Sequence, residues 1–136
     1  MVNIGAVKKV LKVYEDAWIN QDPEKILTVF TKDAIYRERA FKKPFIGHKE
    51  IKQYWQNKVV EEQSDIKFKL LHIWIDGDTV LAEWDASFYR SIEKARTHII
   101  EVAILEFEGD KISERILACG KTIDVFGNIF VQCNRK

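Results

Sequence analysis

The stretch DIKFKLLHIWIDGDTVLAEWDASFYR, residues 65–90, decides the fold class. Its two ends, DIKFKLLHIWI and TVLAEWDASFYR, alternate apolar and polar side chains with a period of two, which is typical of strands. The triplet DGD between them, residues 76–78, supplies the turn residues that join two antiparallel strands in a hairpin. We expect the face of the second strand that carries Trp84 to point toward the core, together with Val80, Ala82, Ala86 and Phe88.

Two more strands are expected after this hairpin. The stretch THIIEVAILEF, residues 97–107, alternates in the same way, and ISERILACGKTIDVF, residues 112–126, follows it after the turn EGDK. Before the hairpin, a short strand is expected in DAIYRERAF, residues 33–41. The segment that follows it, KKPFIGHKE, residues 42–50, is expected to be a turn or loop.

The first part of the chain carries a helical period instead. Apolar residues recur every three or four positions in residues 4–20 and again in residues 48–62, which predicts two amphipathic helices. Between them, Asp22 can cap a short helix that begins with Pro23 and whose apolar face is Ile26, Leu27 and Phe30. Because helices and strands are segregated along the chain, the predicted fold class is α+β.

Length and composition limit the class of protein. A chain of 136 residues that is 46% hydrophobic predicts one domain, residues 1–136, with a core of its own. The net charge of +1 gives no signature of nucleic-acid binding, and no apolar run is long enough to span a bilayer. The first ten residues, MVNIGAVKKV, lack the order of a signal peptide, so we expect a cytoplasmic protein. Cys119 and Cys133 show neither zinc spacing nor a disulfide framework.

Three stretches resemble the nuclear-transport-factor-2-like superfamily, which includes the SnoaL-like and ketosteroid-isomerase-like proteins. They are AWINQDPEKILTVFTKDAIY (residues 17–36), GHKEIKQYW (47–55) and FEGDKI (107–112), and the resemblance covers residues 4–124. It implies a cone-shaped domain in which a strongly curved antiparallel sheet wraps over three N-terminal helices and leaves a pocket at the wide end. The fold hosts many unrelated activities, so the resemblance specifies the architecture better than the function.

The same resemblance implies catalytic roles for Tyr14 and Glu38. In ketosteroid isomerases a tyrosine on the first helix donates to a developing oxyanion, and an aspartate at the end of the first strand moves the proton. Aligned without gaps, Tyr14 takes the tyrosine position and Glu38 the aspartate position. The position of the second oxyanion donor holds Ala103, so steroid isomerisation is not carried over. Taken alone, Tyr14 also fits an apolar helix stripe, and Glu38 also fits a solvated strand end.

A charged pair is also expected in the pocket. Alternation along residues 97–107 puts Glu101 on an otherwise apolar face, which the resemblance turns toward the pocket. A carboxylate there must be paired, hydrogen-bonded or protonated, because burying it unpaired is costly. Arg115 is the natural partner, and it shares with Cys119 a face that the resemblance implies to be pocket-lining. The alternative is a structural Glu–Arg pair with no chemistry.

Aromatic residues indicate an apolar ligand, although ordinary core packing explains any one of them as well. The resemblance implies a phenol network on the third helix, where this chain has Trp55. We expect a small apolar ligand to be bound by seven residues, namely Trp18, Tyr36, Trp55, Trp84, Glu101, Arg115 and Cys119.

Metals, cofactors and partners are predicted as follows. The histidines His48, His72 and His98 are not spaced as metal ligands, so we expect no metal and no cofactor. The opposite face of the sheet carries an apolar stripe that needs a cover, formed by Ile100, Val102 and Ile104. A homodimer through this convex face is the simplest cover, and many members of the superfamily pair in this way.

Three functions compete on these grounds. The first is an isomerase-, cyclase- or lyase-like enzyme that transfers a proton on a small apolar carbonyl compound, with Glu38 as base and Tyr14 as oxyanion donor. The second is a non-catalytic protein that binds a hydrophobic ligand in the same pocket. The third is a protein-interaction module.

Overall fold

The computed structural model describes residues 1–38, 42–123 and 129–133, and of these the side chains of residues 1–38 and 42–118. Its helical elements are α1 (Ile4–Ile19), α2 (Pro23–Leu27), α3 (Gly47–Trp55) and the π-helical turn η1 (Gln56–Val60). Its strands are β1 (Phe30–Arg37), β2 (Phe45–Ile46), β3 (Gln63–Asp76), β4 (Thr79–Arg90), β5 (Ala95–Glu108), β6 (Lys111–Ile123) and β7 (Ile129–Cys133). Helices precede the long strands, and the α+β class is confirmed.

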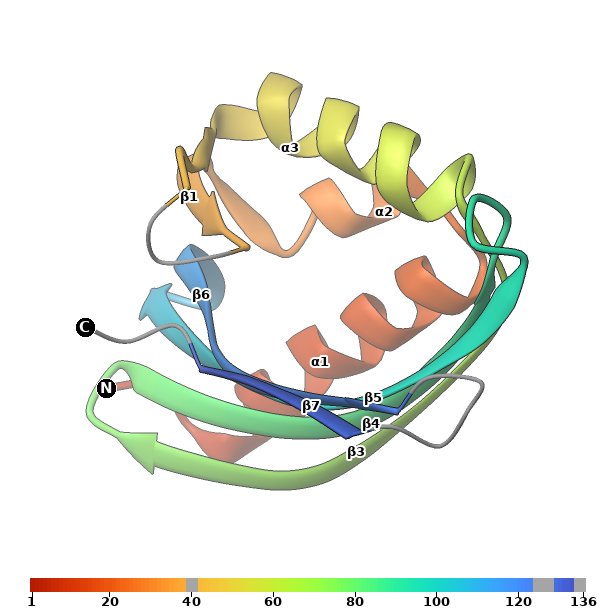
Figure 1. Ribbon diagram of the computed structural model, residues 1–136. Helices are drawn as coiled ribbons and strands as arrows, with labels where there is room; N and C mark the ends of the chain where they lie inside the picture. Colours follow the sequence, from red (N-terminus) through yellow and green to blue (C-terminus); the bar gives the residue numbers. More distant parts are fainter. Residues whose placement is uncertain (39–41, 124–128, 134–136) are drawn as a thin grey trace.

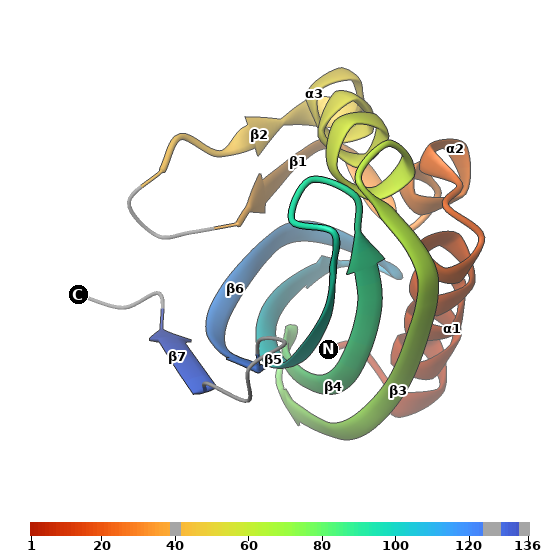
Figure 2. The same cartoon turned by 45° about the vertical axis from the view of Figure 1, so that its right-hand side comes forward.

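The strands form one sheet in the order β2-β1-β6-β5-β4-β3, with β7 paired to β6. The long strands β3 to β6 are antiparallel to their neighbours, whereas β1 runs parallel to β6. Register shifts interrupt the β3–β4 and β5–β6 ladders at two places each, and such bulges bend and twist long strands. The sheet therefore curves around α1 on its concave side, with α3 lying across from it (Figures 1 and 2).

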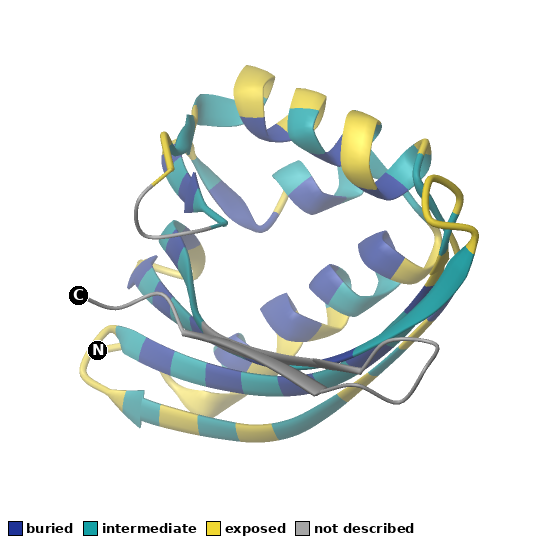
Figure 3. Ribbon diagram, viewed as in Figure 1, coloured by how far each residue is buried: buried dark blue, intermediate teal, exposed yellow. Residues whose placement is uncertain are grey.

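The core lies between this concave face and the helices. Along β4 the buried residues alternate with half-buried ones, as the striped ribbon of Figure 3 shows, and the buried set is Val80, Ala82, Trp84, Ala86 and Phe88. From α1, the rings of Tyr14 and Trp18 lie 5.4 and 6.4 Å from the ring of Trp84. These large aromatic residues join the first helix to the middle of the sheet, and their burial is the main source of stability here.

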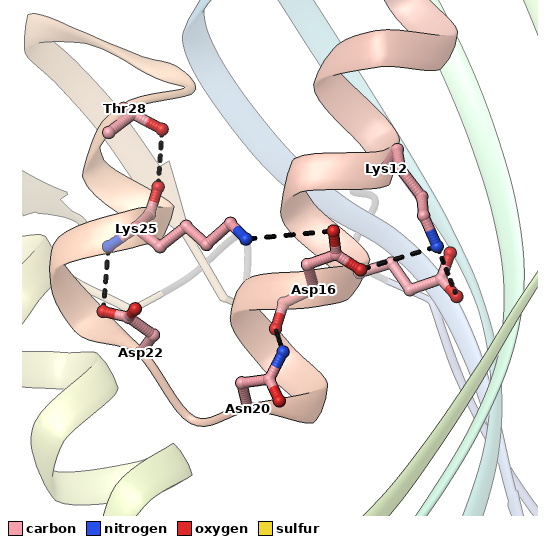
Figure 4. A network of polar contacts seen from close by, with 7 residues as sticks. Lys12, Asp16, Asn20, Asp22, Lys25 and Thr28 are labelled. Carbon is pink, nitrogen blue, oxygen red and sulfur yellow. Dashed lines mark hydrogen bonds and ion pairs between the residues drawn. The ribbon is translucent and has the colours of Figure 1, made fainter.

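The connection between α1 and α2 is fixed by polar contacts (Figure 4). The Asp22 side chain accepts a hydrogen bond from the Lys25 backbone nitrogen at 3.1 Å and caps α2, as predicted. Asp16 of α1 lies 3.5 Å from Lys12 Nζ and 3.8 Å from Lys25 Nζ, which links the two helices. Asn20 donates its side-chain amide to the Asp16 carbonyl at 2.8 Å and closes the end of α1.

Several element bounds differ from those expected. Phe30 begins β1 instead of completing α2, because the helix ends at Leu27 and the next residues turn into a strand that pairs with β6. The helix expected over residues 48–62 continues past Trp55 as a π-helical turn. Within the segment expected to be loop, β2 forms two backbone pairs with β1. Strand β7 was not predicted.

The convex face of the sheet carries the expected apolar stripe. Ile104 is flanked across the ladders by Leu81 and Ile116, and Leu81 in turn by Trp74, which is 50% exposed. Ile100, Val102 and Ile104 are each half-buried in the single chain. None of the helices in the described part of the chain is long and apolar enough to cross a membrane.

Candidate functional site

A cavity of about 460 Å³ is lined by the second half of α1, by the β1–β2 connection with β2, by the end of α3 with η1, and by residues of β3 to β6. Its volume falls in the range of small-molecule sites. Its aromatic wall consists of Tyr14, Trp18, Tyr36, Phe45, Tyr54 and Phe88. The charged residues that line it are Glu38, Glu101 and Arg115, together with Lys42, Lys43, Lys58, Glu62 and Arg90.

Arg115 is the positive centre of the cavity. The parallel pairing of β1 with β6 sets Arg115 beside Tyr36, and its guanidinium carbon lies 4.3 Å from the centre of the Tyr36 ring. Nη1 donates to Glu38 Oε1 at 2.9 Å and to the Arg37 carbonyl at 3.3 Å. The Arg115 side chain is 3% exposed and that of Glu38 is 29% exposed. Among the described residues, the buried Nε of Arg115 meets no acceptor.

Glu101 lies on the β5 face that points into the cavity and is 9% exposed. Burial raises its pKa from 4.5 to about 7, and the charge of Glu38 acts in the same direction. The charge of Arg115 and the indole of Trp84 act the other way, although the Trp84 Nε1 finds no acceptor at hydrogen-bond geometry among the described residues. Near neutral pH this group is therefore divided between its acid and carboxylate forms.

The pairing around Arg115 differs from the expected one. Arg115 forms its ion pair with Glu38 instead of with Glu101. The reason is the β1–β6 register, which was not visible in the sequence and which brings the end of β1 next to Arg115. Glu38 and Glu101 thus bring two carboxyl groups of different character to the cavity, one ion-paired and half-buried, the other buried.

Three tyrosines, Tyr14, Tyr36 and Tyr54, add hydroxyl groups to the residues that line the cavity. Burial raises the pKa values of Tyr14, Tyr36 and Tyr54, in the latter two well above the ordinary value, so all three remain hydrogen-bond donors at neutral pH. The charge of Glu38 and a hydrogen bond to it contribute to the rise at Tyr54. The arrangement offers donors to a developing oxyanion, a carboxylate to take a proton and a buried acid to supply one.

The predicted site residues are placed as follows. Glu38, Tyr14, Trp18, Tyr36, Glu101 and Arg115 all line the cavity. Trp55 and Trp84 do not, because both are fully buried in the aromatic core, with the Trp55 ring 6.0 Å from that of Tyr14. The side chain of Cys119 lies outside the described part of the structure.

Sequence reasoning missed Tyr54 and Phe45 as wall residues. Tyr54 precedes Trp55 on α3, and from the sequence either residue fits the apolar stripe of this helix. In the structure the centre of the Tyr54 ring lies 4.6 Å from that of Phe45 and 5.3 Å from that of Tyr36, with the rings tilted against each other. Phe45 lies in β2, a strand too short to be recognised from its pattern.

The histidines serve other purposes than the cavity. His48 Nε2 lies 3.1 Å from the Phe30 carbonyl, and His72 and His98 are each 2.7 Å from a carboxylate on β4. Within the described residues there is no group of three or more His, Cys, Asp or Glu side chains that could hold a metal ion.

Comparison with known proteins agrees with this architecture. The model of the SnoaL-like domain family matches residues 10–115, and the chain belongs to this family. No protein of the curated collection matches it.

Solved structures with the same fold are distant in sequence. A hypothetical protein of ketosteroid-isomerase-like fold from Catenulispora acidiphila, in complex with trimethylamine, is 16% identical with a TM-score of 0.71 over 79% of this chain and 82% of that one. A candidate SnoaL-like polyketide cyclase from Shewanella putrefaciens is 16% identical with a TM-score of 0.67 over 81% and 86%. An LEH-like epoxide hydrolase of M. tuberculosis is 15% identical with a TM-score of 0.68 over 83% and 81%. At these identities the likeness concerns the fold alone.

Proposed function

We propose that the protein is an enzyme that transfers a proton on a small, largely apolar carbonyl compound. The observation that carries the proposal is the gathering of Glu38, Tyr14, Glu101 and Arg115 around one aromatic cavity. Isolated, each residue has an ordinary structural explanation. Their convergence in a cavity of ligand size favours chemistry.

The proposed reaction is a proton transfer at the carbon next to the carbonyl. The Glu38 carboxylate takes a proton from the carbon next to the carbonyl, and the C–H electron pair forms the C=C bond of an enolate. The negative charge that develops on oxygen is stabilised by the Tyr14 hydroxyl. Protonated Glu38 then returns the proton to the same carbon, where the C=C electron pair of the enolate forms the new C–H bond and the carbonyl is restored. Glu101 and Arg115 orient the polar end of the substrate.

Hydrogen–deuterium exchange tests this step. Purified protein is incubated in D2O with a panel of small cyclic ketones, and loss of the α-proton signal is followed by NMR. We expect catalysed exchange with at least one ketone, and a reduction by about 10²–10⁴ in Glu38→Gln. Glu114→Gln is the matched control, because Glu114 is 28% exposed and pairs with Arg37 at 3.2 Å but does not line the cavity. Equal exchange in both variants contradicts the assignment of the base.

A non-catalytic ligand-binding function is the second candidate. It is favoured by the ion pair between Glu38 and Arg115, because Glu38 Oε1 already accepts a hydrogen bond from Arg115 Nη1 at 2.9 Å and is occupied by a donor of the protein itself. In that case the cavity binds apolar compounds, no ketone of the panel exchanges, and the Glu38→Gln protein retains its affinity.

We also propose a homodimer through the convex sheet face. The half-buried stripe that contains Ile104, with the exposed Trp74 near its edge, supports this interface. Sedimentation velocity over a range of concentrations tests it. Trp74→Lys, together with Ile104→Lys, should shift a dimer to monomer, and a wild-type protein that is monomeric at high concentration contradicts the proposal.

A further inference from the structure

The mouth of the cavity carries more positive than negative charge. Lys42, Lys43 and Lys58 are exposed and yet line the cavity, so they lie at its opening. Lys58 Nζ is neutralised by a carboxylate oxygen of Glu62 at 3.3 Å. Arg90, a further cation among the described residues that line the cavity, is paired with Glu93 at 3.2 Å.

Two lysines therefore remain in excess. Among the described side chains, neither Lys42 nor Lys43 takes part in an ion pair with a carboxylate. Both lie in the connection between β1 and β2. Their charges act outward into solvent and across the opening, where an approaching anion meets them first.

The interior of the cavity suits an anion less well than the mouth does. The guanidinium of Arg115 is already paired with Glu38, and the carboxyl group of Glu101 faces the same space. An anionic group placed at this depth would meet carboxyl groups on two sides. The aromatic wall of the interior instead favours an uncharged, apolar body.

A second depression adjoins the cavity on the side of β2 and α3. Its volume is about 430 Å³, and it shares Lys43, Phe45, Tyr54 and Lys58 with the first. The rings of Phe45 and Tyr54, which are in contact with each other, thus belong to the walls of both spaces, and Lys43 also lines both. A ligand longer than the inner cavity would leave along this wall and pass the excess lysines.

We propose that the ligand of this cavity is an anionic amphiphile, whose apolar body occupies the aromatic interior and whose carboxylate, sulfonate or phosphate group is held at the mouth by Lys42 and Lys43. The inference rests on the proposed ligand pocket and adds the class of compound that it selects. It does not depend on whether the pocket is catalytic.

Two fluorescent probes of nearly the same shape test the proposal. 8-Anilinonaphthalene-1-sulfonate carries a negative charge, and N-phenyl-1-naphthylamine lacks it. Titrations at low salt are made with the wild type, with the double variant Lys42→Gln and Lys43→Gln, and with the control Lys67→Gln and Lys69→Gln. The control lysines are exposed on β3 and do not line the cavity, and their loss changes the net charge by the same amount.

We expect the Lys42/Lys43 variant to bind the sulfonate about fivefold or more weakly, while the neutral dye changes by less than about twofold. The control should bind both dyes like the wild type. About 1 M salt should weaken only the sulfonate in the wild type, because the screening length falls to about 3 Å. Phe88→Ala, which opens the aromatic wall, should weaken both dyes.

The possible failures can be told apart. A sulfonate affinity that does not respond to Lys42 and Lys43 beyond the control overturns the inference, even though the neutral dye shows that the pocket binds apolar compounds. Equal weakening of both dyes in the lysine variant overturns it as well. If neither dye binds the wild type, the ligand pocket on which the inference rests is itself contradicted.

Discussion

Substituting Glu101 by glutamine removes a buried ionisable group while preserving the size of the side chain. The group lies on β5, in the wall of the cavity, and its pKa is raised from 4.5 to about 7, mainly by burial. A carboxyl group with a higher pKa in the folded than in the unfolded protein binds its proton more tightly in the folded protein. Its ionisation therefore opposes folding.

The pH window and the size of the effect follow from these two values. Below pH 4.5 the group is protonated in both states, and no cost arises. Between pH 4.5 and about 7 it is ionised in the unfolded chain but still protonated in the folded one, so the free energy of unfolding falls as the pH rises. Above pH 7 the cost is complete and amounts to roughly 3 kcal/mol, at about 1.4 kcal/mol for each pH unit between the two pKa values. This is a sizeable part of the stability of a small domain.

Urea unfolding of wild type and Glu101→Gln from pH 4 to pH 9 measures this cost, with tryptophan fluorescence as the signal. Between pH 4.5 and about 7 we expect the free energy of unfolding of the variant to rise by roughly 3 kcal/mol relative to that of the wild type. Below and above this range the difference between the two proteins should stay constant. Glu108→Gln, an exposed change on the same strand, should stay within about 0.5 kcal/mol of the wild type. A difference between Glu101→Gln and wild type that does not vary with pH would refute the reasoning.

Three further predictions concern single side chains. Glu38→Gln should lower the pKa of Glu101, because the charge of Glu38 is the second cause of its rise, and carbon-detected NMR titration of the Glu101 carboxyl measures this. Tyr14→Phe should lower the free energy of unfolding by about 1 kcal/mol through loss of a buried hydroxyl, and should reduce any catalysed ketone exchange by about 10²-fold or more. Gln21→Ala should lower the free energy of unfolding, measured in urea, by about 1–2 kcal/mol, because the Gln21 side-chain amide donates to the Val59 carbonyl of η1 at 2.8 Å and to the Gln63 carbonyl of β3 at 2.6 Å. The control Gln53→Ala, at an exposed position, should lower it by less than about 0.5 kcal/mol.

The long antiparallel strands could be predicted because their signals are local. The strand over residues 79–90 has the bounds expected from its alternation and from the DGD turn before it. The pairing of β1 with β6 joins residues almost eighty positions apart, for example Tyr36 with Arg115. It could not be predicted, because no pattern within either strand indicates its partner. Strand β2 has only two residues, which is too few for any period to appear.

The candidate site was predictable where strand alternation and the family pattern agreed. Glu101 and Arg115 were placed in the cavity by alternation along their strands and the family orientation, and Tyr14 by the helical stripe of α1. On α3 the choice between Tyr54 and Trp55 could not be made, because adjacent residues differ by only about 100° around a helix and both fit a wide apolar face. The choice of Glu38 as partner of Arg115 depends on strand register, which the sequence does not reveal.

The energetic role of Glu101 bears on the choice between an enzyme and a structural ion pair. A structural pair gains its stability when opposite charges satisfy each other, but the carboxylate that satisfies Arg115 is that of Glu38. Glu101 is left buried beside Trp84, where its ionised form opposes folding, and a leucine on this face would avoid that cost. Groups that lower stability and line a cavity are typical of functional sites, because selection for stability alone would remove them. The position of Glu101 therefore favours a site that uses its proton or its charge over one in which Glu101 only fills the wall.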